Sequence, residues 1–313
     1  MRVLIVGCGY VGLPLGVELV RLGHEVLGLR RNASAESELK AAGIQPLFGD
    51  VTRPETLAKL PREFDWVVNC VAAGGGADDY RQVYLQGTRN LIEWLAPASA
   101  EASARQALKK FVYTSSTSVY GQTDGSQVKE SSPTEPLAET AKILVETEKL
   151  LLAAVAERKF PAVILRVAGI YGPDRGHWFK QFLKDEARME GDGSRFLNMI
   201  HRDDLIGCII AALKNGRAGE IYNAADDEPV SQLHFFQWLA QSLDKPLPPS
   251  EPAAVALARS GAPRENPDAA RKSGVTNKRV LNRKLKMELG YQFKYPNFRK
   301  GYSAELLRLD RAG

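Results

Sequence analysis

Residues 1–12 read MRVLIVGCGYVG, and they indicate more about the architecture than any other stretch. The short apolar run at 2–6 is typical of a buried β-strand. Three glycines follow this run in G-x-G-x-x-G spacing: Gly7, Gly9 and Gly12. A stretch with helical apolar periodicity at 11–22 comes next. A strand, a glycine-rich turn and a helix in this order predict a dinucleotide-binding unit.

Each glycine of the turn meets a separate requirement of such a site. Gly7 permits the tight turn, Gly9 lets a pyrophosphate approach the backbone, and Gly12 lets the helix pack close to the strand. The pyrophosphate would lie at the N-terminus of the helix, beside Tyr10 and Val11. We therefore predict that these five residues contact a dinucleotide cofactor.

The end of the second predicted strand, at 24–29, indicates which dinucleotide binds. An acidic residue commonly holds the ribose 2′-hydroxyl there, but this chain has Arg30 and Arg31. Guanidinium groups pair well with phosphate, and the missing carboxylate removes a repulsive charge. We predict NADP(H) as the cofactor, with NAD(H) as the alternative. A solvated basic loop is the other interpretation of the two arginines.

Apolar runs alternate with helical stretches through the first half of the chain. The predicted strands are 2–6, 24–29, 44–48, 65–71, 109–114 and 162–167. The predicted helices are 11–22, 35–42, 54–60, 79–96 and 137–157. The segment 96–108, rich in Ala and Ser, fits either a helix extension or a loop. The alternation predicts an α/β fold with a doubly wound parallel sheet of the Rossmann type.

Beyond the sixth predicted strand the pattern becomes less regular. Pro and Gly cluster at 171–176, and a Pro-rich stretch at 246–252 leads into a predicted loop at 260–273. We expect a nucleotide-binding domain over 1–170. A smaller C-terminal substrate lobe is expected over 171–313, from which some strands and helices return to the first domain.

Basic residues exceed acidic ones, 42 against 37, which gives a formal charge of +5. Much of the excess lies in 271–300, where ten Lys or Arg accompany one acidic residue, Glu288. No zinc-ligand spacing or aromatic nucleic-acid motif lies nearby. We therefore expect a solvated helix face or a wall for an anionic substrate, with no nucleic-acid partner and no bound metal.

Three cysteines, Cys8, Cys70 and Cys208, lie far apart in apolar contexts and form no C-x-x-C pair. We expect them to be small core residues in a reducing compartment. The chain enters its first strand at once, without room for a signal peptide, and no apolar run reaches the ~18 residues of a membrane span. The expectation is a cytoplasmic protein with no membrane partner.

Eight stretches occur in an order typical of one family. They are GCGYVG at 7–12, GDV at 49–51, VAA at 71–73, GTRNL at 87–91, TSSTSVYG at 114–121, LRVAGIYGP at 165–173, IHRDD at 200–204 and IYNAA at 221–225. Together they resemble the extended short-chain dehydrogenase/reductase superfamily, the group of nucleotide-sugar epimerases and dehydratases. The resemblance covers nearly the whole chain.

The resemblance also implies where the cofactor lies. By that resemblance Asp50 and Val51 would flank the adenine. Ala72 and Ala73 would line the wall beside the ribose and the nicotinamide.

The serines of TSSTSVYG carry the implied chemistry. Ser116 falls where the family places its catalytic Ser or Thr, at the end of the fifth predicted strand. Its hydroxyl would hydrogen-bond the substrate oxygen that gains or loses a proton during hydride transfer. In the same stretch, Ser115 is expected at the cofactor and Ser118 at the substrate.

The chain departs from the family on the long helix, where relatives carry a Tyr and, four residues on, a Lys. The stretch Pro136–Leu152 contains no tyrosine. One alignment puts Thr140 and Leu144 at the two positions, and another puts Ala138 and Lys142 there. A threonine hydroxyl is a much poorer proton donor than a phenol assisted by Lys. The pattern therefore resembles an atypical branch of the superfamily with an incomplete catalytic set.

Other groups are candidates for the missing chemistry. Tyr120 follows the fifth predicted strand, and Tyr84 lies on the fourth predicted helix; either could supply the proton, or serve as a core residue with a satisfied hydroxyl. Thr140, which one alignment puts at the position of the tyrosine, is also a catalytic candidate. Lys142 could hold the ribose hydroxyls or face solvent.

Five residues of the C-terminal half are predicted to contact the substrate. Arg175, His177 and Trp178 follow the YGP turn and, with Arg195, are expected above the nicotinamide. Arginine with aromatic rings suits a phosphate attached to a planar base, whereas an ordinary charged surface loop is the alternative. His201 resembles a residue that in relatives anchors the second lobe near the substrate, and a structural hydrogen bond is its other interpretation.

Two functional hypotheses remain. The first is an NAD(P)-dependent epimerase/dehydratase-like oxidoreductase with an atypical site, acting on a nucleotide sugar or another small carbonyl compound. The second is a non-catalytic NADP(H)-binding sensor or regulator. Relatives commonly pair through two helices, which makes a homodimer one outcome and a monomer the other. The leucines that would form the interface, or pack on the sheet instead, are Leu91, Leu95, Leu144 and Leu151.

Overall fold

A seven-stranded parallel sheet forms the centre of the computed structural model, which describes residues 1–95, 108–252 and 276–310. Its strand order is β12-β7-β5-β4-β1-β2-β3. The strands are β1 (Arg2–Val6), β2 (Glu25–Arg30), β3 (Gln45–Phe48), β4 (Trp66–Asn69), β5 (Lys110–Ser116), β7 (Ala162–Val167) and β12 (Ile221–Ala224). The chain runs outward from β1 to β2 and β3 and then returns to β4 on the other side of β1. The predicted doubly wound α/β fold is confirmed.

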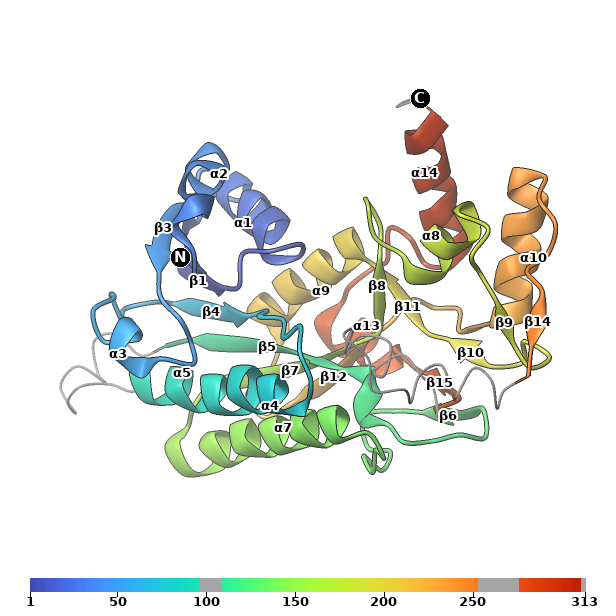
Figure 1. Cartoon of the computed structure of the whole chain (residues 1–313). Coiled ribbons are helices and arrows are strands. Elements are labelled where there is room, and N and C mark those ends of the chain that lie inside the picture. The colour runs from blue at the N-terminus through green and yellow to red at the C-terminus, as the bar shows by residue number, and fades with distance from the viewer. Residues whose placement is uncertain (96–107, 253–275, 311–313) are drawn as a thin grey trace.

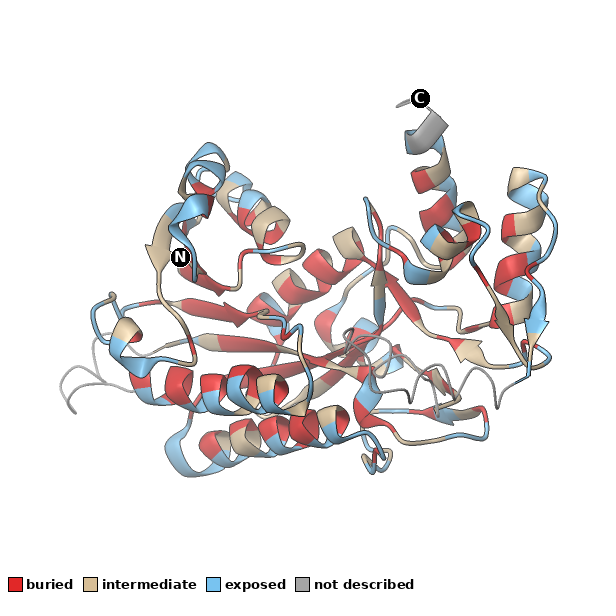
Figure 2. Cartoon of the chain, viewed as in Figure 1, coloured by how far each residue is buried: buried red, intermediate tan, exposed pale blue. Residues whose placement is uncertain are grey.

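Helices cover both faces of this sheet, as Figure 1 shows. The helices on one face are α1 (Gly12–Arg21), α2 (Glu36–Ala41) and α9 (Arg202–Asn215). Those on the other face are α4 (Ala77–Tyr80), α5 (Gly87–Leu95) and α7 (Glu139–Arg158). Every residue of β7 and all of β1 except its first residue are buried between the two layers (Figure 2). Burial on both faces explains why these strands are continuous apolar runs.

The pairing of neighbouring strands sets where each one ends. Val6 pairs with Asn69, and the chain turns away at Gly7, so β4 stops at Asn69 although the sequence predicts a strand to residue 71. The strand β5, in contrast, is longer at its carboxyl end than the predicted strand, which ends at residue 114. It continues to Ser116 because that residue still pairs with Val167 of β7.

Two predicted helices differ from the observed ones. The single helix expected over 79–96 begins at Ala77 and contains a π-helical turn, Arg81–Gln86, between α4 and α5. The helix α3 (Pro54–Leu57) is shorter than expected. The segment 96–107 and the predicted loop at 260–273 lie outside the described residues.

The C-terminal lobe lies beyond the carboxyl ends of the central strands (Figure 1). Its helices are α8 (His177–Leu183), α10 (Gln232–Leu243) and α14 (Phe298–Asp310), while α13 (Arg283–Leu289) packs on α9. Its strands form two-residue or three-residue pairs: β8 (Gly169–Tyr171) with β11 (Met199–His201), β9 (Met189–Glu190) with β14 (Ser250–Glu251), β10 (Phe196–Leu197) with β13 (Val230–Ser231), and β15 (Lys278–Val280) with β6 (Ser126–Val128).

The lobe has an aromatic core of its own, separate from the core of the central sheet. Its members include Phe179, Phe182, Phe235, Phe236, Phe298 and Tyr302. Residues of α9, β12 and α13 join the core of the central sheet instead. From the sequence, we expect such elements of the C-terminal half to pack with the first domain. The division into domains at 1–170 and 171–313 stays a prediction.

Several smaller expectations concern side chains in the core and at the surface. All three cysteines have free thiols; Cys8 and Cys208 are buried and Cys70 is half-buried. The four leucines proposed for a dimer interface are buried within one chain, with exposed fractions of 0–8%. They leave little surface for a partner, and the homodimer stays a prediction.

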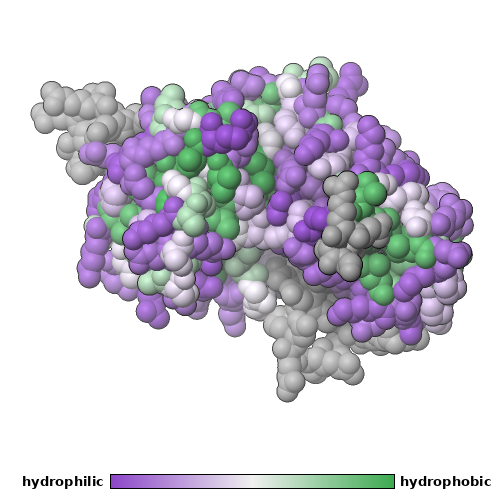
Figure 3. Space-filling view, turned by 90° about the horizontal axis from the view of Figure 1, so that it is seen from above, coloured by the Kyte–Doolittle hydropathy of each residue, from purple (hydrophilic) through white to green (hydrophobic). Residues whose placement is uncertain are grey.

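The face of the molecule that Figure 3 shows is mostly hydrophilic, and the hydrophobic residues on it gather in separate patches. Within the described ranges, none of the helices combines the length and the apolar character that crossing a bilayer requires. The same ranges contain no cluster of His, Cys, Asp or Glu suited to a metal ion.

Candidate active site

The glycine loop joins β1 to α1 in a conformation that depends on two of its glycines. Gly7 has a φ of 94°, which favours glycine. A Cβ atom on Gly12 would lie 2.3 Å from the carbonyl oxygen of Gly7, so only glycine allows this approach. By contrast, a Cβ atom on Gly9 would meet nothing within 4 Å. The loop is therefore tight at its base and open where a ligand would approach.

The N-terminus of α1 is available to an anion. Val11 precedes the helix, and its side chain makes no capping hydrogen bond to the first turn. Uncapped N–H groups and the positive end of the helix dipole favour a phosphate. The residues present therefore fit the pyrophosphate of a dinucleotide.

The two arginines after β2 lie beside this loop but differ in their contacts. The Arg30 guanidinium donates a hydrogen bond to the carbonyl oxygen of Cys8, within the glycine loop. Arg31 is exposed and makes no side-chain hydrogen bond or ion pair with the described residues. Both positions remain compatible with an anionic group at the end of β2.

The segment after β3 is held by short-range hydrogen bonds. Asp50 accepts hydrogen bonds at Oδ1 from the backbone N–H of Thr52 at 2.9 Å and from its hydroxyl at 2.8 Å. The carbonyl oxygen of Val51 accepts one from the side chain of Asn90 at 2.7 Å. These contacts fix the backbone at Asp50 and Val51, whose place at the adenine stays a prediction.

The loop after β4 is fixed in a similar way. Ala72 is exposed, and the buried Ala73 donates its backbone N–H to the Tyr84 hydroxyl at 3.2 Å. Burial raises the pKa of that hydroxyl above its ordinary value. Asp79 accepts hydrogen bonds from the N–H groups of Gly74 and Gly75 at 2.9 and 2.7 Å. Tyr84 thus supports the loop of Ala72 and Ala73, whose place beside the nicotinamide is implied by the resemblance and stays a prediction.

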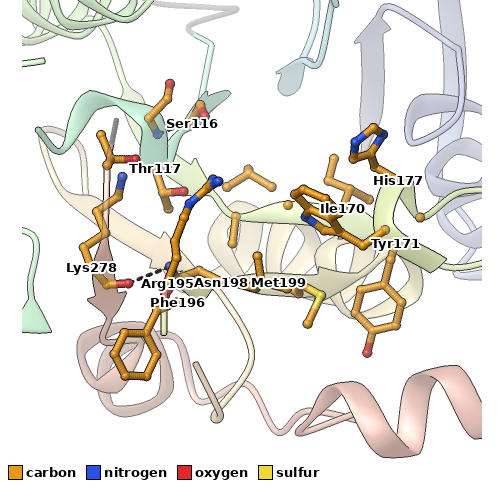
Figure 4. Close-up of a pocket in the computed structure, with 18 of the residues that line it drawn as sticks. Ser116, Thr117, Ile170, Tyr171, His177, Arg195, Phe196, Asn198, Met199 and Lys278 are labelled. Atoms are coloured by element: carbon orange, nitrogen blue, oxygen red, sulfur yellow. Dashed lines mark hydrogen bonds between the residues drawn. The ribbon is translucent and has the colours of Figure 1, made fainter. Parts of the chain in front are cut away.

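A cavity of about 350 Å³ lies between the end of β5 and the C-terminal lobe. Five residues predicted from the sequence line it together: Ser116, Ser118, His177, Trp178 and Arg195. Its other walls include Ile170, Tyr171, Phe196, Asn198, Met199, Lys278 and Tyr302. Figure 4 shows Ser116 and Thr117 at one end and His177 with Tyr171 at the other. A few polar groups in a largely apolar hollow are typical of a small-molecule site.

Ser116 is the last residue of β5 and begins the turn Thr117–Val119. Its hydroxyl oxygen accepts a hydrogen bond from the backbone N–H of Ser118 at 3.1 Å, which caps the turn. That contact uses an acceptor site and leaves the hydroxyl proton free to be donated. Ser116 can therefore donate a hydrogen bond to an oxygen atom in the cavity.

A buried polar network lies behind Ser116, outside the residues that line the cavity. Ser115 donates its hydroxyl to Glu148 at 2.6 Å, and Arg166 holds the same carboxylate at 2.7 Å. Arg166 also donates to the Tyr120 hydroxyl at 2.9 Å, which donates in turn to Asn223 at 2.7 Å. The Ser115 and Tyr120 hydroxyls are thus engaged in the core, and we do not carry Tyr120 forward as a proton donor.

Neither candidate on α7 lines the cavity. Lys142 is exposed, and its Nζ lies 3.5 Å from a carboxylate oxygen of Glu139. Thr140 is half-buried. None of the residues of α7, Glu139–Arg158, is among those that line the cavity.

Arg175, a further predicted residue, lies beside the glycine loop and is not among the residues that line the cavity. The Arg175 guanidinium lies 4.9 Å from the centre of the Tyr10 ring, and the Arg202 guanidinium lies 5.3 Å from it. Buried His201 caps α9 by accepting a hydrogen bond from the N–H of Asp203 at 3.2 Å. Burial lowers the pKa of His201 to about 4. The imidazole is therefore neutral at pH 7, as the structural interpretation requires.

Lys278 is a cavity residue that the sequence analysis did not single out. It comes from β15, is 5% exposed, and donates a hydrogen bond from Nζ to the carbonyl oxygen of Tyr120 at 3.0 Å. Burial lowers the pKa of its amine to about 8, and the charge of Arg195 adds to this effect. The sequence offered one indication that Lys278 could line the site: it belongs to the basic stretch 271–300, for which a wall facing an anionic substrate is one of the two interpretations.

Comparison with known proteins gives results that agree with this geometry. A model of the NAD-dependent epimerase/dehydratase family matches residues 3–225. Protein YeeZ of Escherichia coli K12 is 26% identical over 306 residues, covering 95% of this chain and 97% of that protein. A solved structure of a functionally unknown conserved protein from Silicibacter pomeroyi is 27% identical, with a TM-score of 0.75 and 98% of each chain covered.

A shorter match involves a relative with a named reaction. The dTDP-D-glucose 4,6-dehydratase of Bos taurus is 29% identical over 172 residues. The match covers 53% of this chain and 46% of the bovine protein.

Proposed function

This chain belongs to the NAD-dependent epimerase/dehydratase family, and we propose that it is an oxidoreductase or epimerase acting on a nucleotide sugar or another small carbonyl compound. The family confirms the nicotinamide dinucleotide expected from the glycine loop. One observation carries the proposal: Ser116, at the end of β5, shares a cavity with His177, Trp178 and Arg195 of the lobe.

The cofactor would be held by the glycine loop and the arginines that follow β2. Gly7, Gly9 and Gly12 with the uncapped start of α1 suit the pyrophosphate, and Arg30 with Arg31 suits a 2′-phosphate. We infer a preference for NADP(H) from these two charges. When bound, the cofactor supplies or accepts a hydride at its nicotinamide ring.

The chain's own residues would orient the substrate and stabilise its reacting oxygen. The Ser116 hydroxyl donates a hydrogen bond to that oxygen, which strengthens as negative charge develops there. Arg195 and Trp178 supply a cation and an aromatic face, which suit the phosphate and base of a nucleotide. The named reaction of the bovine relative, on a dTDP-sugar, supports this substrate class.

The test is turnover of NADPH or NADP⁺ with a panel of UDP- and dTDP-hexoses and simple aldehydes and ketones. Ser116→Ala should lower the turnover of any active substrate by about 10²-fold, because one transition-state hydrogen bond is lost. The exposed Ser131 is a matched control, and Ser131→Ala should leave turnover unchanged. Inertness of the wild-type protein across the panel would contradict the proposal.

The second candidate, a non-catalytic NADP(H) sensor, is favoured by one observation. The helix α7 carries no tyrosine, and Lys142 pairs with Glu139 at its surface. A sensor should bind the cofactor without oxidising it, and Ser116→Ala should leave its biological role intact.

A further inference from the structure

Lys278 lies at the Ser116 end of the cavity. Its strand β15 pairs with β6, which brings it beside the turn that follows Ser116. In Figure 4 the amine points toward Thr117, next to Ser116. An ammonium group has three N–H donors, and one of them is used on the Tyr120 carbonyl oxygen. Two donors therefore remain for a ligand in the cavity.

The charge of Lys278 has no acidic partner in the part of the chain that the structure describes. Arg195, which lies nearby, already holds Glu190 through contacts of 2.6 and 2.8 Å. A buried ammonium without a counter-charge is costly, and the burial that lowers its pKa to about 8 also makes proton exchange near neutral pH feasible. Such a lysine is suited to acid–base chemistry.

The other titratable groups on the cavity wall are less well placed, and one of them, Tyr302, stacks on the Tyr171 ring with 4.4 Å between the ring centres. His177 and Tyr171 lie at the opposite end from Ser116 (Figure 4). The Tyr171 hydroxyl lies against the backbone of Gly301 in α14, turned away from Ser116. Arg195 is a guanidinium, a group that does not serve as a proton donor or acceptor in proteins. Lys278 thus combines nearness to Ser116 with an exchangeable proton.

We propose that Lys278 exchanges the proton with the substrate oxygen, in the role that the phenol has in relatives. This inference rests on the proposed function. In the reductive direction, the Lys278 ammonium donates a proton to the carbonyl oxygen while the carbonyl carbon takes a hydride from the reduced nicotinamide cofactor. The C=O π bond breaks, a C–H and an O–H bond form, and the neutral amine regains a proton from water. In the oxidative direction the neutral amine accepts the hydroxyl proton.

Two substitutions of Lys278 distinguish a role in proton exchange from a role that needs only its positive charge. Lys278→Met removes both, whereas Lys278→Arg keeps the charge but cannot release a proton near neutral pH. Both variants should lose about 10²- to 10⁴-fold in kcat on a substrate that the wild type converts, with an unchanged Kd for the cofactor. Recovery of wild-type kcat by Lys278→Arg would show that only the charge matters and would overturn the proposal.

A matched control lies in the same basic stretch. Lys286 is exposed on α13 and pairs with Asp227 at 2.9 Å. Lys286→Met removes one positive charge without touching the cavity, so its kcat should equal that of the wild type. If the wild type converts no substrate, the proposed function fails. If it does and Lys278→Met matches it, only the assignment of Lys278 fails.

A second readout needs neither substrate nor cofactor. The rate at which acetic anhydride labels Lys278, followed by peptide mass spectrometry across pH 6–11, reports the pKa of the amine. We expect a midpoint near 8, and a midpoint near the ordinary value of about 10.4 would overturn the role in proton exchange. This measurement uses the wild-type protein, so it decides the question even if Lys278→Met does not fold.

Discussion

The Arg175 guanidinium lies over the ring of Tyr10, 4.9 Å from its centre, and so joins the C-terminal lobe to the glycine loop. Tyr10 is the residue between Gly9 and Val11, at the place where the cofactor pyrophosphate is expected. The contact therefore lets the lobe influence the shape of the cofactor loop, although Arg175 does not line the cavity.

Arg175→Ala should weaken cofactor binding by about two- to thirtyfold, because a cation–π contact of about 0.5–2 kcal/mol no longer holds the loop. Isothermal titration calorimetry with NADP⁺ measures the effect. Lys180 is an exposed cation on α8, so Lys180→Ala controls for the loss of one positive charge from the lobe. Equal effects of the two substitutions would mean that the ring contact contributes nothing.

Arg31→Ala should lower affinity for NADPH by roughly tenfold or more and leave affinity for NADH unchanged. The reason is the loss of a charge-assisted hydrogen bond to the 2′-phosphate, worth about 1.5–3 kcal/mol. Arg31 has no partner among the described residues, so its removal disturbs little else. Arg21, exposed at the far end of α1, serves as the control. A uniform loss for both cofactors would contradict the assignment of NADP(H).

Glu148→Ala should destabilise the fold by about 3–5 kcal/mol, since it leaves the Arg166 charge buried without its partner. Glu146, two residues earlier on α7, pairs with Arg81 at the surface, and Glu146→Ala should cost less than ~1 kcal/mol. Urea unfolding at pH 7 compares the two variants. Equal losses in the free energy of unfolding would show that the buried pair of Glu148 and Arg166 contributes no more to stability than the surface pair of Glu146 and Arg81.

The stability of the protein should fall as the pH drops from 6.5 toward 4, in part because of His201. Burial lowers the pKa of His201 from 6.5 to about 4, so in this interval the unfolded chain binds a proton that the folded chain does not. Each pH unit then costs up to about 1.4 kcal/mol. His201→Asn retains a capping side chain without a titrating group, so it should flatten the profile.

Urea unfolding between pH 4.5 and 8 measures this difference. The exposed His234 on α10 provides the control, and His234→Asn should follow the wild-type profile. If His201→Asn also follows it, the imidazole does not contribute to the acid sensitivity.

Local patterns were enough to predict the sheet. The strand 162–167 agrees with β7 in both bounds, because it is a continuous run rich in Val, Ile and Leu whose residues are all buried between the two helical layers. The limits of β4 and β5 could not be predicted, because the partner strand decides how far pairing continues at Asn69 and Ser116.

The candidate site was predicted in part. The resemblance predicts Ser116 at the reacting oxygen, and the chemistry of Trp178 and Arg195 predicts them on the substrate side; the cavity brings the three together. Tyr120 follows the same strand, but after the turn its side chain enters the core, which sequence spacing does not reveal. Lys278 reaches the cavity through the pairing of β15 with β6, across about 150 residues of chain, and no local pattern indicates such a contact.

A crystal structure of the protein with NADP⁺ tests the central claim most directly, because the cavity should be where the cofactor and the substrate meet. We expect the nicotinamide ring at the Ser116 wall, with the hollow toward Arg195 and Lys278 still open to a substrate. A nicotinamide ring elsewhere, or a side chain that fills the hollow, would contradict the account.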